Sequence, residues 1–289
     1  MTRRKSLALA GVTVWFVAGT LAPSEVTLRA QAGTTRTVYI SAVDAKGAFV
    51  TNLAAGDVTV AENGQVREVT GLAPATESCH VAVLVDDGGD GLMQGPVAEL
   101  LNAAVGRALF SVSMLNPQSI RLNDYTASLD TLQGSVSKLR QRGRVERDTA
   151  VLADAVSWTA RDMLRRKLSR PVIVIMTNGG DSAEREIANG ILNDLSASGA
   201  SLHLVHVVSV ELGQVFIDGP TQSGGSSSVT TSTGGFSKAM TAIAMTLANQ
   251  YKLTYVLPAG VRPSERLKVT TTRPQVKIVA PTRISSRVP

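Results

Sequence analysis

Residues 81–91 read Val-Ala-Val-Leu-Val-Asp-Asp-Gly-Gly-Asp-Gly, and this stretch decides the fold. An unbroken apolar run such as 81–85 is typical of a parallel strand that is buried on both faces. Residues 86–91 then combine three carboxylates with three glycines, which predicts a sharp polar loop directly after the strand. Residues 172–181 repeat the pattern, since Val-Ile-Val-Ile-Met is followed by Thr-Asn-Gly-Gly-Asp. The chain therefore contains two strongly apolar strands that end in polar clusters.

Amphipathic segments alternate with these strands along the middle of the chain. Apolar residues recur at helical spacing in 97–108, 152–163, 187–195 and 236–247, and a further strand is predicted at 202–208. Strands that alternate with helices indicate βαβ units. We therefore predict one doubly wound α/β domain at 78–251, with a mostly parallel sheet and helices on both faces. Residues 120–125 and 127–132 are predicted to form a strand pair, at an edge of that sheet.

The flanking segments have the two-residue period of β-strands. In the N-terminal β segment, 33–75, Asn63-Gly64 predicts a type I′ hairpin turn. In the C-terminal β segment, 252–289, turns rather than crossover helices separate the strands, so we expect it to pair with 33–75 in a small β unit. Residues 222–235 are rich in Ser, Gly and Thr and carry no charge, so we expect a disordered loop there.

The first 32 residues have the layout of a secretory signal peptide. Arg3, Arg4 and Lys5 precede an uncharged stretch at 6–22, and Ala30-Gln-Ala32 offers small residues for cleavage. An uncleaved N-terminal anchor is the alternative, and no later segment has an apolar run long enough to cross a bilayer. We therefore expect an exported protein, periplasmic or secreted, with no membrane span in the mature chain.

Charge and cysteine content narrow the classes of partner and fold. Loss of residues 1–32 removes four basic residues and one acidic residue, which lowers the formal net charge from +6 to +3. That balance gives little support for a nucleic-acid partner. Cys79 is the only cysteine, so no intramolecular disulfide can form, and its place beside an apolar strand favours burial.

Several short motifs occur in an order that resembles bacterial exported proteins related to the von Willebrand factor type A domain. These motifs are the aspartate loop at 86–91, Thr149-Ala-Val-Leu-Ala-Asp154, Val174-Ile-Met-Thr-Asn-Gly179, the turn at Glu62-Asn-Gly64, Thr233-Gly-Gly235 and Gln250-Tyr-Lys-Leu-Thr-Tyr255. The resemblance spans nearly the whole mature chain. It implies the doubly wound fold and a protein-binding role.

The resemblance also implies a metal-ion-dependent adhesion site, which in that family binds a divalent cation, usually Mg²⁺. Its pattern is Asp-x-Ser-x-Ser with a threonine and an aspartate from later loops. The implied ligands are Asp86, Asp90, Thr149 and Asn178. Gly88 stands at a serine position without a side-chain oxygen, Asp90 replaces the other serine, and Asn178 replaces the aspartate. A rearranged cation site and a degenerate, metal-free loop both stay open.

A basic cluster precedes Thr149 and offers a second route to recognition. It consists of Arg140, Arg142, Arg144 and Arg147. Such runs are commonly solvated faces. Alternatively, Arg142 and Arg144 bind carboxylates of a partner protein, which needs no metal.

Catalytic signatures are missing from the sequence. There is no G-x-S-x-G nucleophile elbow, no phosphate-binding P-loop and no dinucleotide fingerprint. His203 and His206 are three apart on a predicted strand and therefore point to opposite faces. We accordingly predict no enzyme. The expected function is an exported protein-interaction module, and the alternative is a structural or assembly component of the cell envelope with a vestigial site.

Overall fold

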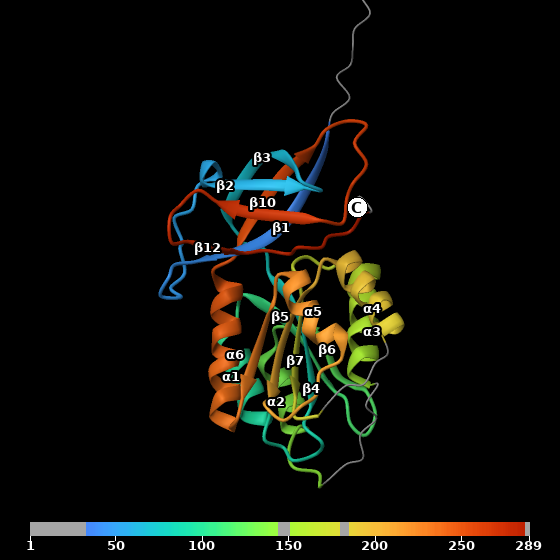
Figure 1. The fold of residues 1–289 in the computed structure, drawn as a ribbon. Coiled ribbons are helices and arrows are strands. Elements are labelled where there is room, and N and C mark those ends of the chain that lie inside the picture. The colour runs from blue at the N-terminus through green and yellow to red at the C-terminus, as the bar shows by residue number, and fades with distance from the viewer. Residues whose placement is uncertain (1–32, 144–150, 180–184, 287–289) are drawn as a thin grey trace, which may run out of the picture. The chain divides into compact units, whose positions relative to one another are not determined.

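The computed structural model describes residues 33–143, 151–179 and 185–286. Two six-stranded sheets make up this part of the chain (Figure 1). One sheet is mostly parallel and is covered by helices, and the other is antiparallel. Both belong to one compact unit at 32–289.

The apolar run 81–85 lies in a strand of the mostly parallel sheet. Its strands are β4 (Cys79–Asp86), β5 (Ala108–Met114), β6 (Ile120–Thr126), β7 (Pro171–Thr177), β8 (Ser201–Val207) and β9 (Ser226–Thr230). Their order is β6-β5-β4-β7-β8-β9, and all neighbours are parallel except β5 and the edge strand β6. The predicted doubly wound α/β class is confirmed.

Helices cover both faces of this sheet. The first face carries α1 (Gln94–Ala104) and α6 (Thr233–Ala248), and the second carries α3 (Val151–Arg165), α4 (Arg185–Ser198) and α5 (Gln214–Ser223) (Figure 1). Alternate residues of β4 enter the two cores, with Val81, Val83 and Val85 in the first and Ala82 and Leu84 in the second. This double burial explains why 81–85 is apolar without interruption. Cys79 is buried at the start of the same strand, as expected.

The antiparallel sheet is built from both ends of the described chain. Its strands are β1 (Thr34–Val43), β2 (Val58–Glu62), β3 (Gln65–Pro74), β10 (Tyr251–Leu257), β11 (Leu267–Thr271) and β12 (Lys277–Val279), in the order β11-β2-β3-β10-β1-β12; a short 3-10 turn, η1 (Ala55–Asp57), precedes β2. The predicted pairing of the two segments is confirmed by β1–β10 and β2–β11. Asn63 and Gly64 both have positive φ in the β2–β3 turn, as a type I′ hairpin requires.

The expectation of a disordered loop at 222–235 was wrong. Helix α5 extends to Ser223, β9 pairs in parallel with β8, and α6 begins at Thr233. The segment is ordered because its main chain completes the sheet, which needs no apolar side chains of its own. Phe216 of α5 and Phe236 of α6 anchor it from either side in the two cores.

The prediction of a second strand at 127–132 was also wrong. Residues 120–126 form the edge strand β6, but α2 (Leu129–Ser137) replaces the strand expected at 127–132. Ser128 caps this helix by accepting a hydrogen bond from the Thr131 amide, and Leu132 is buried. A capped start and one buried position per turn favour a helix over a second edge strand.

The proposed signal peptide, 1–32, lies outside the described residues. Within the described part of the chain, no helix has both the length and the apolarity to cross a membrane.

Candidate functional site

The acidic loop follows β4 at the place where the strand order of the α/β sheet reverses. From β4 the chain continues to β5 on one side, and β7 later takes the other side. Asp86 is the last residue of β4 and is in register with Thr177, the last residue of β7. Ligands of doubly wound sheets bind beyond the carboxyl ends of strands at such a switch point. The topology therefore puts Asp86 where a ligand is expected.

Asp86 is buried and its carboxylate accepts hydrogen bonds from two neighbouring side chains. The Thr177 hydroxyl donates to Oδ2 at 2.5 Å, and the Asn116 amide donates to Oδ1. Thr177 ends β7 and Asn116 lies just after β5, so the two donors come from either side of β4. A buried carboxylate needs such donors because it has lost its water.

Asp87 is also buried and anchors the loop. Its carboxylate accepts the amides of Gly89 at 2.9 Å and Gly91 at 3.2 Å. The guanidinium of Arg142 completes the set with Nη2 2.6 Å from Oδ1. A charged donor at this distance makes a strong bond, and here it balances the charge of Asp87 within the chain.

Close backbone approach brings Arg142 to this loop. The Arg142 amide donates to the Gly89 carbonyl at 2.8 Å. A Cβ atom at position 91 would lie 2.4 Å from the Gln141 amide nitrogen, and Gly91 has a φ of +77°. Only glycine meets both demands. The glycines of the loop thus allow the segment after α2 to dock against it.

Asp90 and Asn178 form the remaining contact across the two strand ends. The Asn178 amide donates to Asp90 Oδ2 at 2.7 Å and to the Asp87 carbonyl at 3.1 Å. The other oxygen of Asp90 accepts the Leu92 amide at 2.8 Å. Asn178 therefore acts as a hydrogen-bond donor to a carboxylate, which an aspartate at this position would not do.

Three of the four metal ligands implied by the resemblance meet at this edge of the sheet. Asp86, Asp90 and Asn178 lie together, while Thr149 falls outside the described residues, as does Arg144. Arg142 lies at the same edge, but its guanidinium is turned to Asp87. Thr177 and Asn116 are site residues that are not among the ligands implied by the resemblance. The sequence signal that could have indicated them is their position at or just after the ends of the strands that flank β4.

Within the described residues, protein donors hold the carboxylates of the acidic loop. Carboxylates that bind Mg²⁺ present oxygen lone pairs to the ion. Here those of Asp86, Asp87 and Asp90 accept protein donors, and one donor is a guanidinium. No group of three or more His, Cys, Asp or Glu residues suited to a metal occurs in the described ranges.

The two strand histidines have separate surroundings. His203 is buried between Ser226, whose hydroxyl is 2.9 Å from Nδ1, and Ser201 at 3.4 Å from Nε2. Burial lowers the pKa of His203 to about 4. His206 is instead in register with Thr177, and its Nδ1 lies 3.0 Å from the Val207 carbonyl. The two residues belong to opposite faces of β8, so they do not act together.

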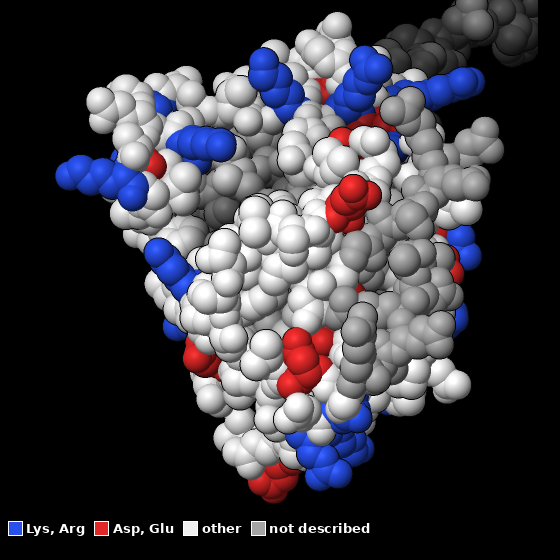
Figure 2. Space-filling model, turned by 60° about the horizontal axis from the view of Figure 1, so that its bottom comes forward, with Lys and Arg blue, Asp and Glu red and all other residues white. Residues whose placement is uncertain are grey.

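Figure 2 turns toward the viewer the end of the molecule that carries the acidic loop. Uncharged side chains cover most of the middle of this view, with separate acidic and basic groups around them. Leu92, directly after the loop, is 57% exposed. Arg140 is exposed as well, two residues before Arg142. Exposed apolar residues and exposed arginines are both found at protein interfaces.

Among known proteins, similarity to this chain was found only in solved structures. No protein-family model and no curated protein matches the sequence. A von Willebrand factor type A protein from Catenulispora acidiphila is 10% identical, with a TM-score of 0.46, over 87% of this chain and 73% of that chain. Proximal thread matrix protein 1 from the mussel byssus, with a zinc-occupied MIDAS motif, is 14% identical, with a TM-score of 0.47, over 63% of this chain and 48% of that chain. The SpRpn10 VWA domain is 14% identical, with a TM-score of 0.43, over 57% of this chain and 94% of that chain.

Proposed function

We propose that this chain is an exported protein-interaction module that binds a partner protein at the carboxyl ends of β4 and β7 without a divalent cation. The salt bridge between Arg142 and Asp87 is the observation that carries the proposal. It supplies an internal cation to the loop that also carries the implied ligands Asp86 and Asp90, at the switch point of a doubly wound sheet. Export follows from the basic and apolar character of residues 3–22.

The surface beside the loop supports protein recognition. Leu92 supplies an exposed apolar contact, and Arg140 supplies a cation with no carboxylate partner among the described residues. Arg142 differs, because it is committed to Asp87 and to the main-chain carbonyls of Lys138 and Arg140. We therefore assign the contact with an acidic side chain of the partner to Arg140 together with Arg144, and give Arg142 the role of holding the loop.

Metal independence is tested by thermal unfolding of the purified mature chain in millimolar MgCl₂, MnCl₂ or CaCl₂. A cation that binds the folded state raises Tm by mass action. We expect no rise in the wild type, because protein donors already satisfy the carboxylates. A rise that disappears in Asp86→Ala would show that a cation displaces those donors, and the metal-free form of the proposal would then be wrong.

The partner surface is tested by placing a photo-cross-linking residue at one of three exposed positions. These are Leu92 beside the loop, Met245 on α6 and Val66 in the antiparallel sheet, with exposed fractions of 57%, 50% and 72%. Cross-linking is carried out in cells that express and export the chain. We expect a defined adduct from position 92 that is lost when Arg140→Glu is added. No adduct is expected from position 245.

The antiparallel sheet gives the second candidate function a specific basis. Both ends of the described chain contribute to it, and Val66 is highly exposed there. In a structural or assembly component with a vestigial loop, this sheet makes the contacts. Adducts from position 66 and none from position 92 would support that function and contradict the proposed one.

A further inference from the structure

A cavity of about 400 Å³ lies at the amino ends of β7 and β8. It is therefore at the opposite end of the α/β sheet from the acidic loop. Pro171 and Ser201, the first residues of these strands, both line it, and other walls come from β1, the end of α4 and residues 281–285. Its volume falls within the range of roughly 300–1,000 Å³ typical of small-molecule sites.

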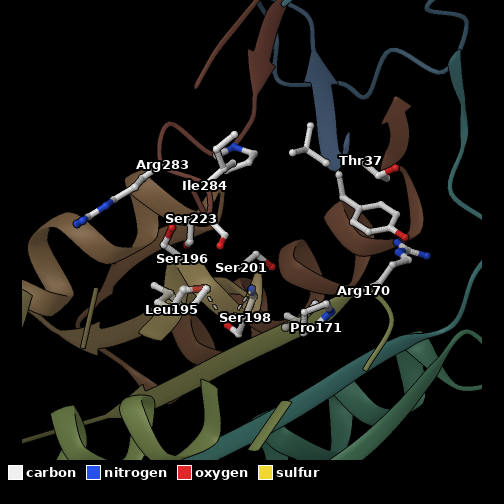
Figure 3. Close-up of a pocket in the computed structure, with 18 of the residues that line it drawn as sticks. Thr37, Arg170, Pro171, Leu195, Ser196, Ser198, Ser201, Ser223, Arg283 and Ile284 are labelled. Atoms are coloured by element: carbon white, nitrogen blue, oxygen red, sulfur yellow. Dashed lines mark hydrogen bonds between the residues drawn. The ribbon is translucent and has the colours of Figure 1, made fainter. Parts of the chain in front are cut away.

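Both polar and apolar side chains line this cavity (Figure 3). Hydroxyl side chains gather on its floor, from Ser196, Ser198, Ser201 and Ser223. Leu195 and Ile284 lie toward one side, and Arg170 lies on the other side next to Pro171. Such an arrangement suits a ligand with one polar end and one apolar end.

The charges around the cavity are all positive. No Asp or Glu lines it within the described part of the chain, whereas Arg36, Arg170 and Arg283 do. Arg36 forms a salt bridge with Glu62, and Arg283 forms one with Glu265, each at 3.0 Å. Figure 3 also shows the Arg283 side chain directed away from the cavity. Two of the three charges are therefore balanced by the protein.

Arg170 is the exception. It is 5% exposed, and no described carboxylate lies within salt-bridge distance of it. Its guanidinium donates to neutral acceptors, the carbonyls of Glu77 at 2.5 Å and Leu247 at 2.8 Å and the Gln250 amide oxygen at 2.9 Å. It also lies 5.3 Å from the centre of the Tyr39 ring.

Part of the charge on Arg170 is offset by the C-terminal end of α6, which includes the Leu247 carbonyl. A helix end of this kind carries about half a negative charge, so a net positive charge stays beside the cavity. The Arg170 Nε is buried without a hydrogen-bond partner. Because a buried charge is costly unless it is paired, an anion in the adjoining cavity would be stabilised there.

We propose that this cavity binds a small amphipathic carboxylate, with its charge toward Arg170 and its apolar body toward Leu195 and Ile284. The end of α4, whose last residues line the cavity near Leu195, presents negative helix-end carbonyls and disfavours an anion on that side. This site is separate from the partner surface proposed at the carboxyl ends of β4 and β7.

The test varies the charge of the ligand rather than that of the protein, because Arg170 also holds main-chain segments together. Octanoate, 1-octanol and octylamine share one apolar chain and differ in head-group charge. Calorimetric titration of the mature chain is expected to show octanoate binding at least about tenfold more tightly than octanol, since hydrogen bonds to charged groups are the stronger ones. Octylamine is expected not to bind. Equal affinities for octanoate and octanol, or no octanoate binding, would overturn the proposal.

Location is tested with two matched variants. Ser196→Phe fills the floor of the cavity, and Ser137→Phe makes the same change on the exposed face of α2. Octanoate affinity is expected to fall at least about tenfold in the first variant and to stay unchanged in the second. Loss confined to Ser196→Phe, with wild-type Tm, supports the site. Equal octanoate binding by both variants would show that the ligand lies elsewhere and would refute it.

Discussion

Several buried ionisable residues in this protein either pair with an opposite charge or stay neutral. Arg142 balances Asp87, and Glu62 at the end of β2 balances Arg36 while accepting the Tyr255 hydroxyl at 2.8 Å. His203 is treated differently, since it is buried beside two serine hydroxyls and has no carboxylate partner among the described residues. Its burial opposes protonation.

His203 should make stability depend on pH in the acidic range. The pKa of its imidazole is lowered from 6.5 to about 4 by burial. As the pH falls from 6.5 toward 4, the unfolded chain binds a proton that the folded chain does not, so stability is lost through this window. It is fully present above 6.5. The contribution reaches roughly 3 kcal/mol from a shift of this size.

The measurement is urea unfolding of wild type and His203→Gln at several pH values between 4 and 7. We expect the difference in unfolding free energy between the two proteins to change with pH inside that window and to be constant above it. A difference that is the same at every pH would show that burial of His203 does not suppress its protonation.

At the scale of elements, the start of α6 contains two adjacent glycines with different surroundings. Ser232 caps the helix by accepting the Gly235 amide at 3.3 Å, and Thr230 at the end of β9 bonds back to Ser232. A Cβ atom at position 235 would lie 1.8 Å from the Thr230 hydroxyl oxygen. At position 234 the nearest atom would be 4.0 Å away. Only Gly235 is required for the passage from strand to helix.

Gly235→Ala and Gly234→Ala therefore form a matched pair. We expect Gly235→Ala to destabilise the protein by about 1–3 kcal/mol, because Thr230 and the cap must shift to make room. Gly234→Ala should be neutral or stabilising by up to about 1 kcal/mol, since alanine restricts the unfolded chain more than glycine. Chemical denaturation measures both. Similar losses in the two variants would contradict the close contact between Thr230 and position 235.

At the scale of the whole molecule, the chain passes between its two sheets twice, at 75–78 and at 249–250. Arg170, just before β7, donates to both passages, to Glu77 in the first and to Gln250 in the second. It also contacts the Tyr39 ring on β1. One buried side chain thus connects the helix-covered sheet to β1 and to the segments that adjoin β3 and β10 of the antiparallel sheet.

Arg170→Lys should cost several kcal/mol, about 3 or more, because lysine cannot reproduce the planar set of donors and a buried ammonium is left with unmet hydrogen bonds. The control is Arg166→Lys, which affects an arginine whose salt bridge to the exposed Asp124 is 2.7 Å long. That change should cost less than about 1 kcal/mol. Urea unfolding measures both, and an equally small loss in both variants would rule out the connecting role of Arg170.

Local pattern in the sequence determined the α/β class, the strand that ends at Asp86 and the pairing of the terminal β segments. These follow from hydrophobic period and from turn residues such as Asn63-Gly64, which act over a few positions. The same patterns gave wrong predictions for residues 222–235 and 127–132. Pairing with the neighbouring strand β8 holds β9, and a single buried leucine, Leu132, holds α2, so neither element depends on a high apolar content of its own.

Tertiary structure alone decided what the acidic loop contacts. From the sequence, the carboxylates at 86–90 suggested a cation with Asn178 as a ligand. In the folded chain, a guanidinium from position 142 and amides from 116 and 178 supply the donors instead. Contacts between residues this far apart depend on strand order and loop docking, which no short-range pattern encodes. The cavity beside Arg170 has the same origin, since its walls come from segments more than 200 residues apart in the chain.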